Sequence, residues 1–200
     1  MPNFWYPRST TGRTFPLWES NLGERKYSGV ERISALMPFP SSFSNAIGSN
    51  TVTATSANVG QLIFPCPIDV LSFSYNIGGA GNADSVMRFS LYTVDGATQI
   101  FNVTDASAAA TGVRTVSISP NQYLAAGPYY MLYCLSSGTT APAISIHGTN
   151  GAFATGASGQ PDLEGVLTVS GGAAPATIDP TALTTPGSER TLWCRFDGVV

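Results

Sequence analysis

Charged side chains are scarce in this sequence. Lys, Arg, Asp and Glu together make up 10% of the 200 residues, whereas about 25% is usual for a globular domain. Small uncharged residues take their place, including 21 glycines. A lone domain this poor in charge tends to associate. We therefore expect copies of the chain, or partner proteins, to cover much of its surface.

The few charges are unevenly placed. Residues 1–32 hold five basic and three acidic side chains, and the rest of the chain holds four basic and nine acidic ones. The body is thus net acidic and lacks the dense basic stripe that nucleic-acid binding requires. No run approaches the roughly 18 apolar residues of a membrane span. We expect neither a nucleic acid nor a membrane as a partner.

Cysteines are also few, namely Cys66, Cys134 and Cys194. Their number is odd, their spacings are long, and no zinc or CxxC pattern appears. This indicates buried free thiols in a reducing compartment; one disulfide with one free thiol is the alternative. The N-terminus MPNFWYPRS lacks the basic start and apolar run of a signal peptide. We therefore expect synthesis in a cytoplasm.

The sequence offers little for catalysis. Its one histidine, His147, follows the apolar stretch AISI, and no G-x-S-x-G motif accompanies it to suggest a triad. Asp162 and Glu164 stand two apart and would share a face of a strand, which leaves a paired-carboxylate glycosidase open. The other acids are scattered, so only a structural Ca²⁺ in a loop remains as a metal site. We predict no catalytic residue, metal or cofactor.

Residues 1–50 differ from the rest. They are rich in aromatics and are broken by Pro2, Pro7 and Pro16, which disfavour regular structure. We predict an extended N-terminal arm, folded back on its own domain or docked on another subunit. Residues 20–36 are compatible with one short helix, although two glycines weaken it, and residues 37–50 are typical of a linker. The candidate anchors are aromatic: Phe4, Trp5, Tyr6, Phe15 and Trp18.

From residue 51 the sequence is typical of β-structure. Short stretches of alternating apolar and polar residues lie between turn residues. The expected strands are 51–56, 59–65, 68–77, 86–94, 98–104, 112–119, 128–136, 142–147, 163–169 and 190–196. No amphipathic helix separates them, so residues 51–200 predict an antiparallel β-sandwich, jelly-roll-like. Residues 170–189 form a long loop, expected to protrude, to clasp another subunit or to be a plain surface loop.

The stretch 129–135 (YYMLYCL) is apolar on both faces, whereas a strand with one wet face alternates. We expect Tyr129, Met131, Tyr133 and Leu135 to fill the sandwich. Tyr130, Leu132 and Cys134 then need another cover. We predict a subunit interface there, or the arm; the alternative is a monomer in which the chain's own loop 170–189 covers them.

The segment from Val86 to Thr140 has a recognisable order. RFSLYTVDG is followed by TQIFNVTDASAAATGVRTVSIS and then by YLAAGPYYMLYCLSSGTT. This order resembles the β-sandwich modules of virion proteins of tailed bacteriophages, notably tail-fibre, head-fibre and other minor structural proteins. The resemblance covers roughly 55 residues and brings no catalytic residue. Gly127-Pro128-Tyr129 departs from it, because Pro128 has no backbone donor, which suggests an unpaired strand start.

The resemblance implies a non-enzymatic, homo-oligomeric virion protein, made in the host bacterial cytoplasm. We expect a capsid decoration (cement) protein or a compact fibre component, fastened by its arm to a major capsid or tail protein. Trimeric assembly is implied by the resemblance alone. The alternative function is a receptor- or glycan-binding module of a tail fibre. Exposed tyrosines would then contact a host surface glycan, with Tyr92 and Tyr129 as candidates.

Overall fold

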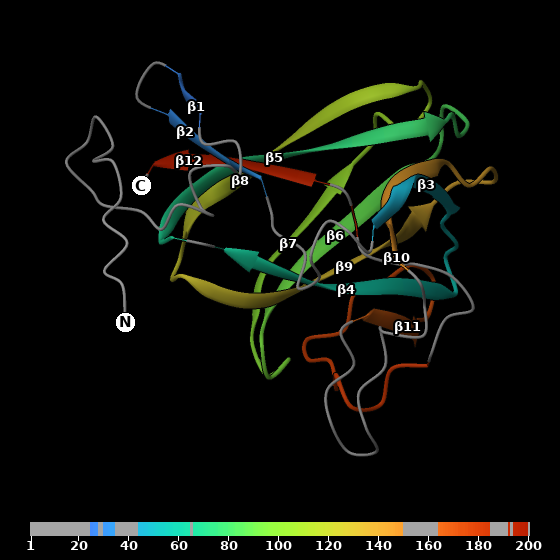
Figure 1. The fold of residues 1–200 in the computed structure, drawn as a ribbon. Helices are drawn as coiled ribbons and strands as arrows, with labels where there is room; N and C mark the ends of the chain where they lie inside the picture. Colours follow the sequence, from blue (N-terminus) through green and yellow to red (C-terminus); the bar gives the residue numbers. More distant parts are fainter. Residues whose placement is uncertain are drawn as a thin grey trace, which may run out of the picture.

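The chain folds as two antiparallel sheets packed face to face (Figure 1). The computed structural model describes residues 25–27, 30–34, 44–64, 66–149, 164–184, 192 and 194–199; below residue 51 and at 147–149 it describes only the backbone. Within these ranges there are strands, turns and loops but no helix. The predicted all-β, antiparallel β-sandwich is confirmed.

One sheet has seven strands in the order β1-β2-β12-β5-β10-β3, with β8 paired to β5 outside this path. Both β8 and β12 pair with Tyr75, so they lie on opposite edges of β5. The strands are β1 (Arg25–Tyr27), β2 (Val30–Ser34), β3 (Ser44–Thr51), β5 (Ile68–Gly79), β8 (Gly112–Leu124), β10 (Ala143–Thr149) and β12 (Cys194–Val199).

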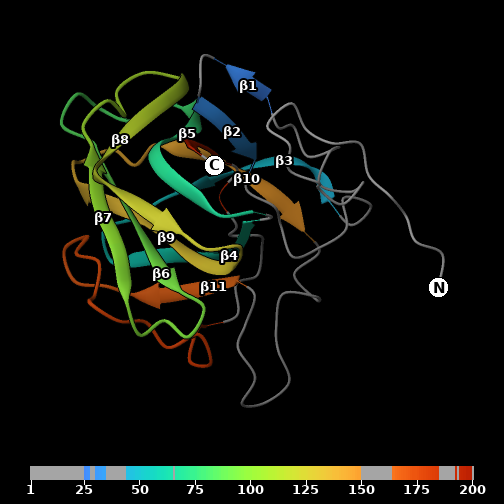
Figure 2. The same cartoon turned by 90° about the vertical axis from the view of Figure 1, so that its left-hand side faces the viewer.

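The second sheet has five strands in the order β11-β4-β9-β6-β7. They are β4 (Ser56–Phe64), β6 (Val86–Thr93), β7 (Gln99–Asp105), β9 (Gly127–Ser137) and β11 (Glu164–Thr168). The chain passes from β7 to β8 and so crosses between the sheets. β7 and β8 are edge strands of the two layers and lie on the same side of the sandwich (Figure 2).

The main core lies between the sheets and is rich in aromatics. Phe73 of β5 meets Phe89 of β6 with 5.0 Å between ring centroids. Phe64 of β4 meets Phe196 of β12 at 4.9 Å. Both contacts are edge-to-face, which suits the ring quadrupoles. Because strand side chains alternate, the inward residues of β5 include Phe73, Tyr75 and Ile77, all buried.

The N-terminal region departs from the prediction. Residues 20–36 are compatible in sequence with a short helix, but residues 25–27 and 30–34 are strands. β2 pairs with β12, and β3 pairs with β10. The predicted boundary at residue 50 is therefore wrong for β1 to β3, which belong to the seven-stranded sheet. Residues 52–55, expected within a strand, instead form a connection between β3 and β4.

Candidate assembly surfaces

Strand β9 is covered on both faces. Tyr130, Leu132 and Cys134 point away from the main core, yet all are 0% exposed. They form a second cluster with Val59 and Tyr92 of neighbouring strands, closed over by Val169, Ile178 and Leu183. These last three belong to residues 169–184, which we call the strap. It follows β11 and is the orange-to-red segment near that strand in Figure 1.

The predicted subunit interface at Tyr130, Leu132 and Cys134 is therefore wrong for the folded chain. The strap already excludes water from these three side chains, so no exposed area remains for a second subunit. The alternative, in which the chain's own loop covers β9, describes the structure. The strap does not simply protrude, because Ile178 and Leu183 are buried against the sheet. Residues 185–189 of that loop lie outside the described residues.

Arg88 of β6 anchors the start of the strap. Its Nε donates to the carbonyl oxygen of Gly172 at 2.8 Å. Its two Nη atoms donate to Asn102 Oδ1 at 2.9 Å and to Ser136 Oγ at 3.0 Å. The guanidinium thus joins three strands to the strap with charge-assisted bonds, which are stronger than neutral ones. Cys134 Sγ donates to the same Gly172 carbonyl at 3.5 Å.

Tyr92 anchors the middle of the strap. Its hydroxyl donates to the Pro175 carbonyl oxygen at 2.6 Å. Gln99 Nε2 donates to both the Tyr92 oxygen and the Pro175 oxygen, at 3.0 and 3.1 Å. Burial raises the pKa of the Tyr92 hydroxyl above its ordinary value, and burial also raises the pKa of the Cys134 thiol to about 11. Both groups are therefore neutral at pH 7.

Two glycines let the strap approach the sheet closely. Gly96 has φ of +70° and Gly172 has φ of +68°, in the left-handed region that favours glycine. A Cβ at Gly96 would collide with the backbone of Ile178, and one at Gly172 with the backbone of Leu135 and Ser136. Gly96 also accepts a hydrogen bond from the Ile178 amide at 3.0 Å. These two glycines therefore allow the strap to pack directly against the sheet.

The two candidate glycan-binding tyrosines do not form one surface. Tyr92 is 0% exposed beneath the strap, so it is unavailable to a sugar and that prediction is wrong. Tyr129 lies on the opposite face of the sheet, where its ring contacts Phe64 with 5.4 Å between centroids. Its hydroxyl donates to the Ala125 carbonyl oxygen at 3.0 Å. Tyr129 is half-buried and packs at the edge of the main core.

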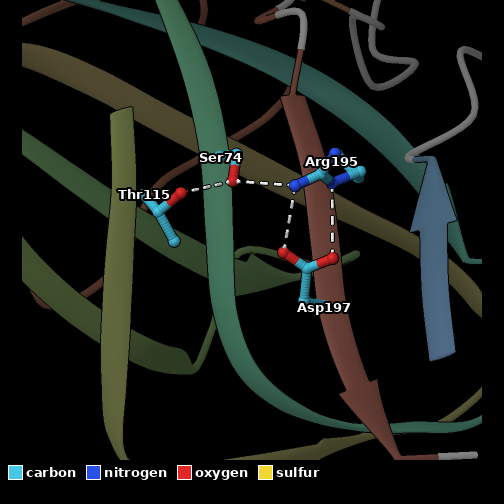
Figure 3. Close-up of polar contacts among 4 residues, drawn as sticks. All are labelled: Ser74, Thr115, Arg195 and Asp197. Carbon is cyan, nitrogen blue, oxygen red and sulfur yellow. Dashed lines mark hydrogen bonds and ion pairs between the residues drawn. The ribbon is translucent and has the colours of Figure 1, made fainter. Parts of the chain in front are cut away.

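The outer face of β12, β5 and β8 carries a row of polar side chains. Arg195 Nε lies 3.3 Å from Asp197 Oδ1, and Arg195 Nη2 donates to Ser74 Oγ at 3.4 Å. Ser74 Oγ in turn lies 2.9 Å from Thr115 Oγ1. Figure 3 shows this row crossing β12, β5 and β8. The row ends at Thr115, on the edge of the sheet.

Several candidate residues lie outside what the structure describes. These are Asp162, the side chain of His147, and the anchors Phe4, Trp5, Tyr6, Phe15 and Trp18. Glu164, the partner proposed for Asp162, is buried in β11. Among the described side chains, no three His, Cys, Asp or Glu residues gather as they would around a metal ion. Nor is any helix in the described ranges long and apolar enough to span a bilayer.

All three cysteines are buried, as predicted. Comparison with known proteins adds no family: no protein-family model matches the chain, and no curated protein matches it. The geometry of the described residues is therefore what bears on function.

Sequence reasoning missed two of the three polar side chains that hold the strap, namely Arg88 and Gln99. Arg88 and Gln99 stand at polar positions of alternating strands, where solvent exposure is the ordinary expectation. One signal was present: Ile178 and Leu183 are apolar residues within a loop rich in Gly, Pro and Thr. Since β9 had an uncovered apolar face, these two residues were available partners for it.

Proposed function

We propose that the protein is a non-enzymatic structural component of a tailed-phage virion, present in several copies. In this proposal the β-sandwich is the body, and the N-terminal segment fastens it to a major capsid or tail protein. A capsid decoration protein or a compact fibre component fits a chain of 200 residues. The protein would be made in the host bacterial cytoplasm and act on the particle.

The main support comes from the segment that resembles phage virion modules, residues 86–140. It coincides with β6, β7, β8 and β9, four consecutive strands that contribute to both sheets. β9 returns to pair with β6 along the whole length of β6. The resembling segment is thus one supersecondary unit that spans the sandwich, which is what a shared module requires.

The strands found before residue 51 narrow the attachment segment. Because β1 begins at Arg25, residues 1–24 are what remains of the predicted arm. All five candidate anchors fall within it. Burying one large apolar side chain is worth about 1.5–3 kcal/mol. Several such contacts in each of several linked copies would give long-lived attachment through avidity.

Attachment can be tested with particles that lack the protein. Tailed-phage particles formed from a genome without this gene are mixed with purified full-length chain, and bound protein is quantified after sedimentation. We expect Trp5→Ala and Trp18→Ala each to weaken binding about tenfold or more, which follows from the burial energy at 1.4 kcal/mol per tenfold. The matched control is Tyr123→Ala, since Tyr123 is 66% exposed on the body.

Unchanged binding of both Trp variants would overturn the assignment of the attachment to residues 1–24. No binding of the wild-type chain to any such particle would overturn the proposed function. The glycan-binding alternative has lost support, because Tyr92 is buried under the strap.

A further inference from the structure

Among the described residues, the edge of the seven-stranded sheet formed by β8 is open. In the described part of the chain, β8 pairs with β5 and with no other strand. It is also the longest strand of that sheet, at 13 residues. An open edge presents a row of unpaired N–H and C=O groups and is a template for another strand. The edge strand β11, by contrast, is closed by two backbone hydrogen bonds between Val166 and Thr184.

Part of the β8 edge is protected and part is not. The register with β5 passes from Ser117 directly to Gln122, so residues 118–121 bulge out of the ladder. Pro120 lies in this bulge and has no backbone donor. Bulges and edge prolines are devices that block strand addition. The remaining stretch, Gly112 to Ser117, pairs with β5 without interruption and has neither device.

Arg114 is the charged residue of the unprotected stretch, and its side chain does not block strand addition. A charged side chain on an edge strand ordinarily discourages pairing. Arg114, however, is turned back to its own loop, where Nη2 donates to the Ala110 carbonyl oxygen at 2.7 Å. Beside it, Val113 is 65% exposed, the second most exposed of the large apolar side chains that the structure describes. The stretch is therefore suited to contact with another protein strand.

The polar row of Figure 3 indicates how an added strand would align along this edge. Ser74 accepts a hydrogen bond from Arg195 and lies 2.9 Å from Thr115 Oγ1. A hydroxyl carries one proton and two lone pairs. Ser74 can therefore donate to Thr115, which leaves the Thr115 proton for an acceptor beyond the edge. Threonines directly opposite each other on neighbouring strands form such hydrogen bonds.

We propose that two copies of this chain pair through β8 in antiparallel fashion, with Thr115 opposite Thr115 of the second copy. The pairing is symmetric and closes as a two-fold dimer. It joins the two seven-stranded sheets into one continuous sheet. In this register Arg114 faces Val116 and Val113 faces Ser117, so no like charges are directly opposed. The Thr115 hydroxyl, which meets its own counterpart in this register, favours a second copy over an unrelated strand.

The inference rests on the proposed function only for the idea that the chain associates with itself. It is tested in solution without a particle, so attachment can fail while this pairing holds. Antiparallel partners have Cα atoms about 4.5–5.5 Å apart, within the range of a disulfide. Full-length Thr115→Cys should therefore oxidise to a covalent dimer. The native cysteines are buried and do not compete.

The matched control is Ser117→Cys, an exposed position on the same strand. In the proposed register the two copies of residue 117 are offset by about four residues, or roughly 14 Å, so they cannot bridge. We expect at least a tenfold higher cross-linking rate for Thr115→Cys than for Ser117→Cys. Equal rates, or cross-linking only at 117, would overturn the register and the proposal.

Light scattering on the unmodified full chain provides the second measurement. We expect twice the mass of one chain, and a dimer dissociation constant raised at least tenfold by Val113→Lys. Val199→Lys is the control, since Val199 is 47% exposed on a different strand. A wild-type monomer at every concentration, or equal weakening by both variants, would overturn the proposal.

Discussion

The Tyr92 hydroxyl donates a 2.6 Å hydrogen bond to the Pro175 carbonyl oxygen, across the boundary between the five-stranded sheet and the strap. This contact illustrates how the apolar outer face of β9 is closed. The strap supplies Val169, Ile178 and Leu183 as apolar cover, and polar anchors on β6 and β7 hold its backbone.

Removing the Tyr92 hydroxyl should loosen the strap. In Tyr92→Phe the Pro175 oxygen still accepts from Gln99, so no buried acceptor is orphaned. We therefore expect a loss of about 1 kcal/mol in the free energy of unfolding, the usual worth of one hydrogen bond. Urea denaturation measures it, with Tyr123→Phe as the exposed control. Equal stability of Tyr92→Phe and wild type would show that this bond does not hold the strap.

Two adjacent glycines offer a matched test of the close approach at the strap. Gly171 and Gly172 both have positive φ, but a Cβ at Gly171 meets open space. We expect Gly171→Ala to cost about 1–2 kcal/mol, from the left-handed backbone alone. Gly172→Ala should cost more, because its Cβ collides with the backbone of β9. Thermal or urea unfolding of the two variants compares them, and equal costs would contradict the fitted contact.

Truncation of Leu132 tests whether the residues that cover the outer face of β9 come from the same chain. Leu132 is fully buried, so Leu132→Ala should cost about 2–5 kcal/mol. Since the strap belongs to the same chain, this loss should be independent of protein concentration. Val94→Ala, at an exposed position outside the proposed β8 pairing, should cost far less. A loss for Leu132→Ala that shrinks as concentration rises would indicate that a second subunit completes the cover.

Stability should fall in alkaline solution. Burial raises the pKa of Cys134 from its ordinary 9.0 to about 11, and burial also raises the pKa values of Cys194, Tyr75 and Tyr92. Between pH 9 and 11 the unfolded chain releases protons that the folded chain retains. The unfolded state then binds fewer protons, and the free energy of unfolding decreases with pH.

Cys134→Ser isolates one contribution to this pH dependence. Serine is similar in size, can also donate to Gly172, and does not ionise in this range. The slope of unfolding free energy against pH between 9 and 11 should therefore be shallower than in wild type. Denaturant titrations at several pH values measure it. An identical slope would mean that the Cys134 thiol does not stay protonated in the fold.

Local patterns were enough to predict most of the sandwich strands, because alternation marks a strand that has one buried face. Phe73, Tyr75 and Ile77 are inward as expected. Leu71 continues the same apolar alternation along the sequence, but it is only half-buried, since a register shift between Val70 and Ser72 moves it outward. Such a shift depends on the partner strand and leaves no mark in the alternation.

The strands at the N-terminus depend on partners far along the chain. β2 pairs with β12, whose residues lie more than 150 positions later, and nothing local distinguishes VERIS from a short helix. The strap was recognised only as one alternative, because its cover depends on where a loop returns in space. The edge at β8 was likewise invisible in the sequence, since strand order is a property of the sheet.

Particle composition tests the central claim most directly. Virions from a lysate of the host that carries this gene are banded in a density gradient, washed at high salt and examined by quantitative mass spectrometry. The proposed structural role predicts the chain in the particle band at many copies per particle. Retention in high salt is expected because apolar contacts are not screened. A chain that stays at the top of the gradient, absent from the particle band, would contradict the account.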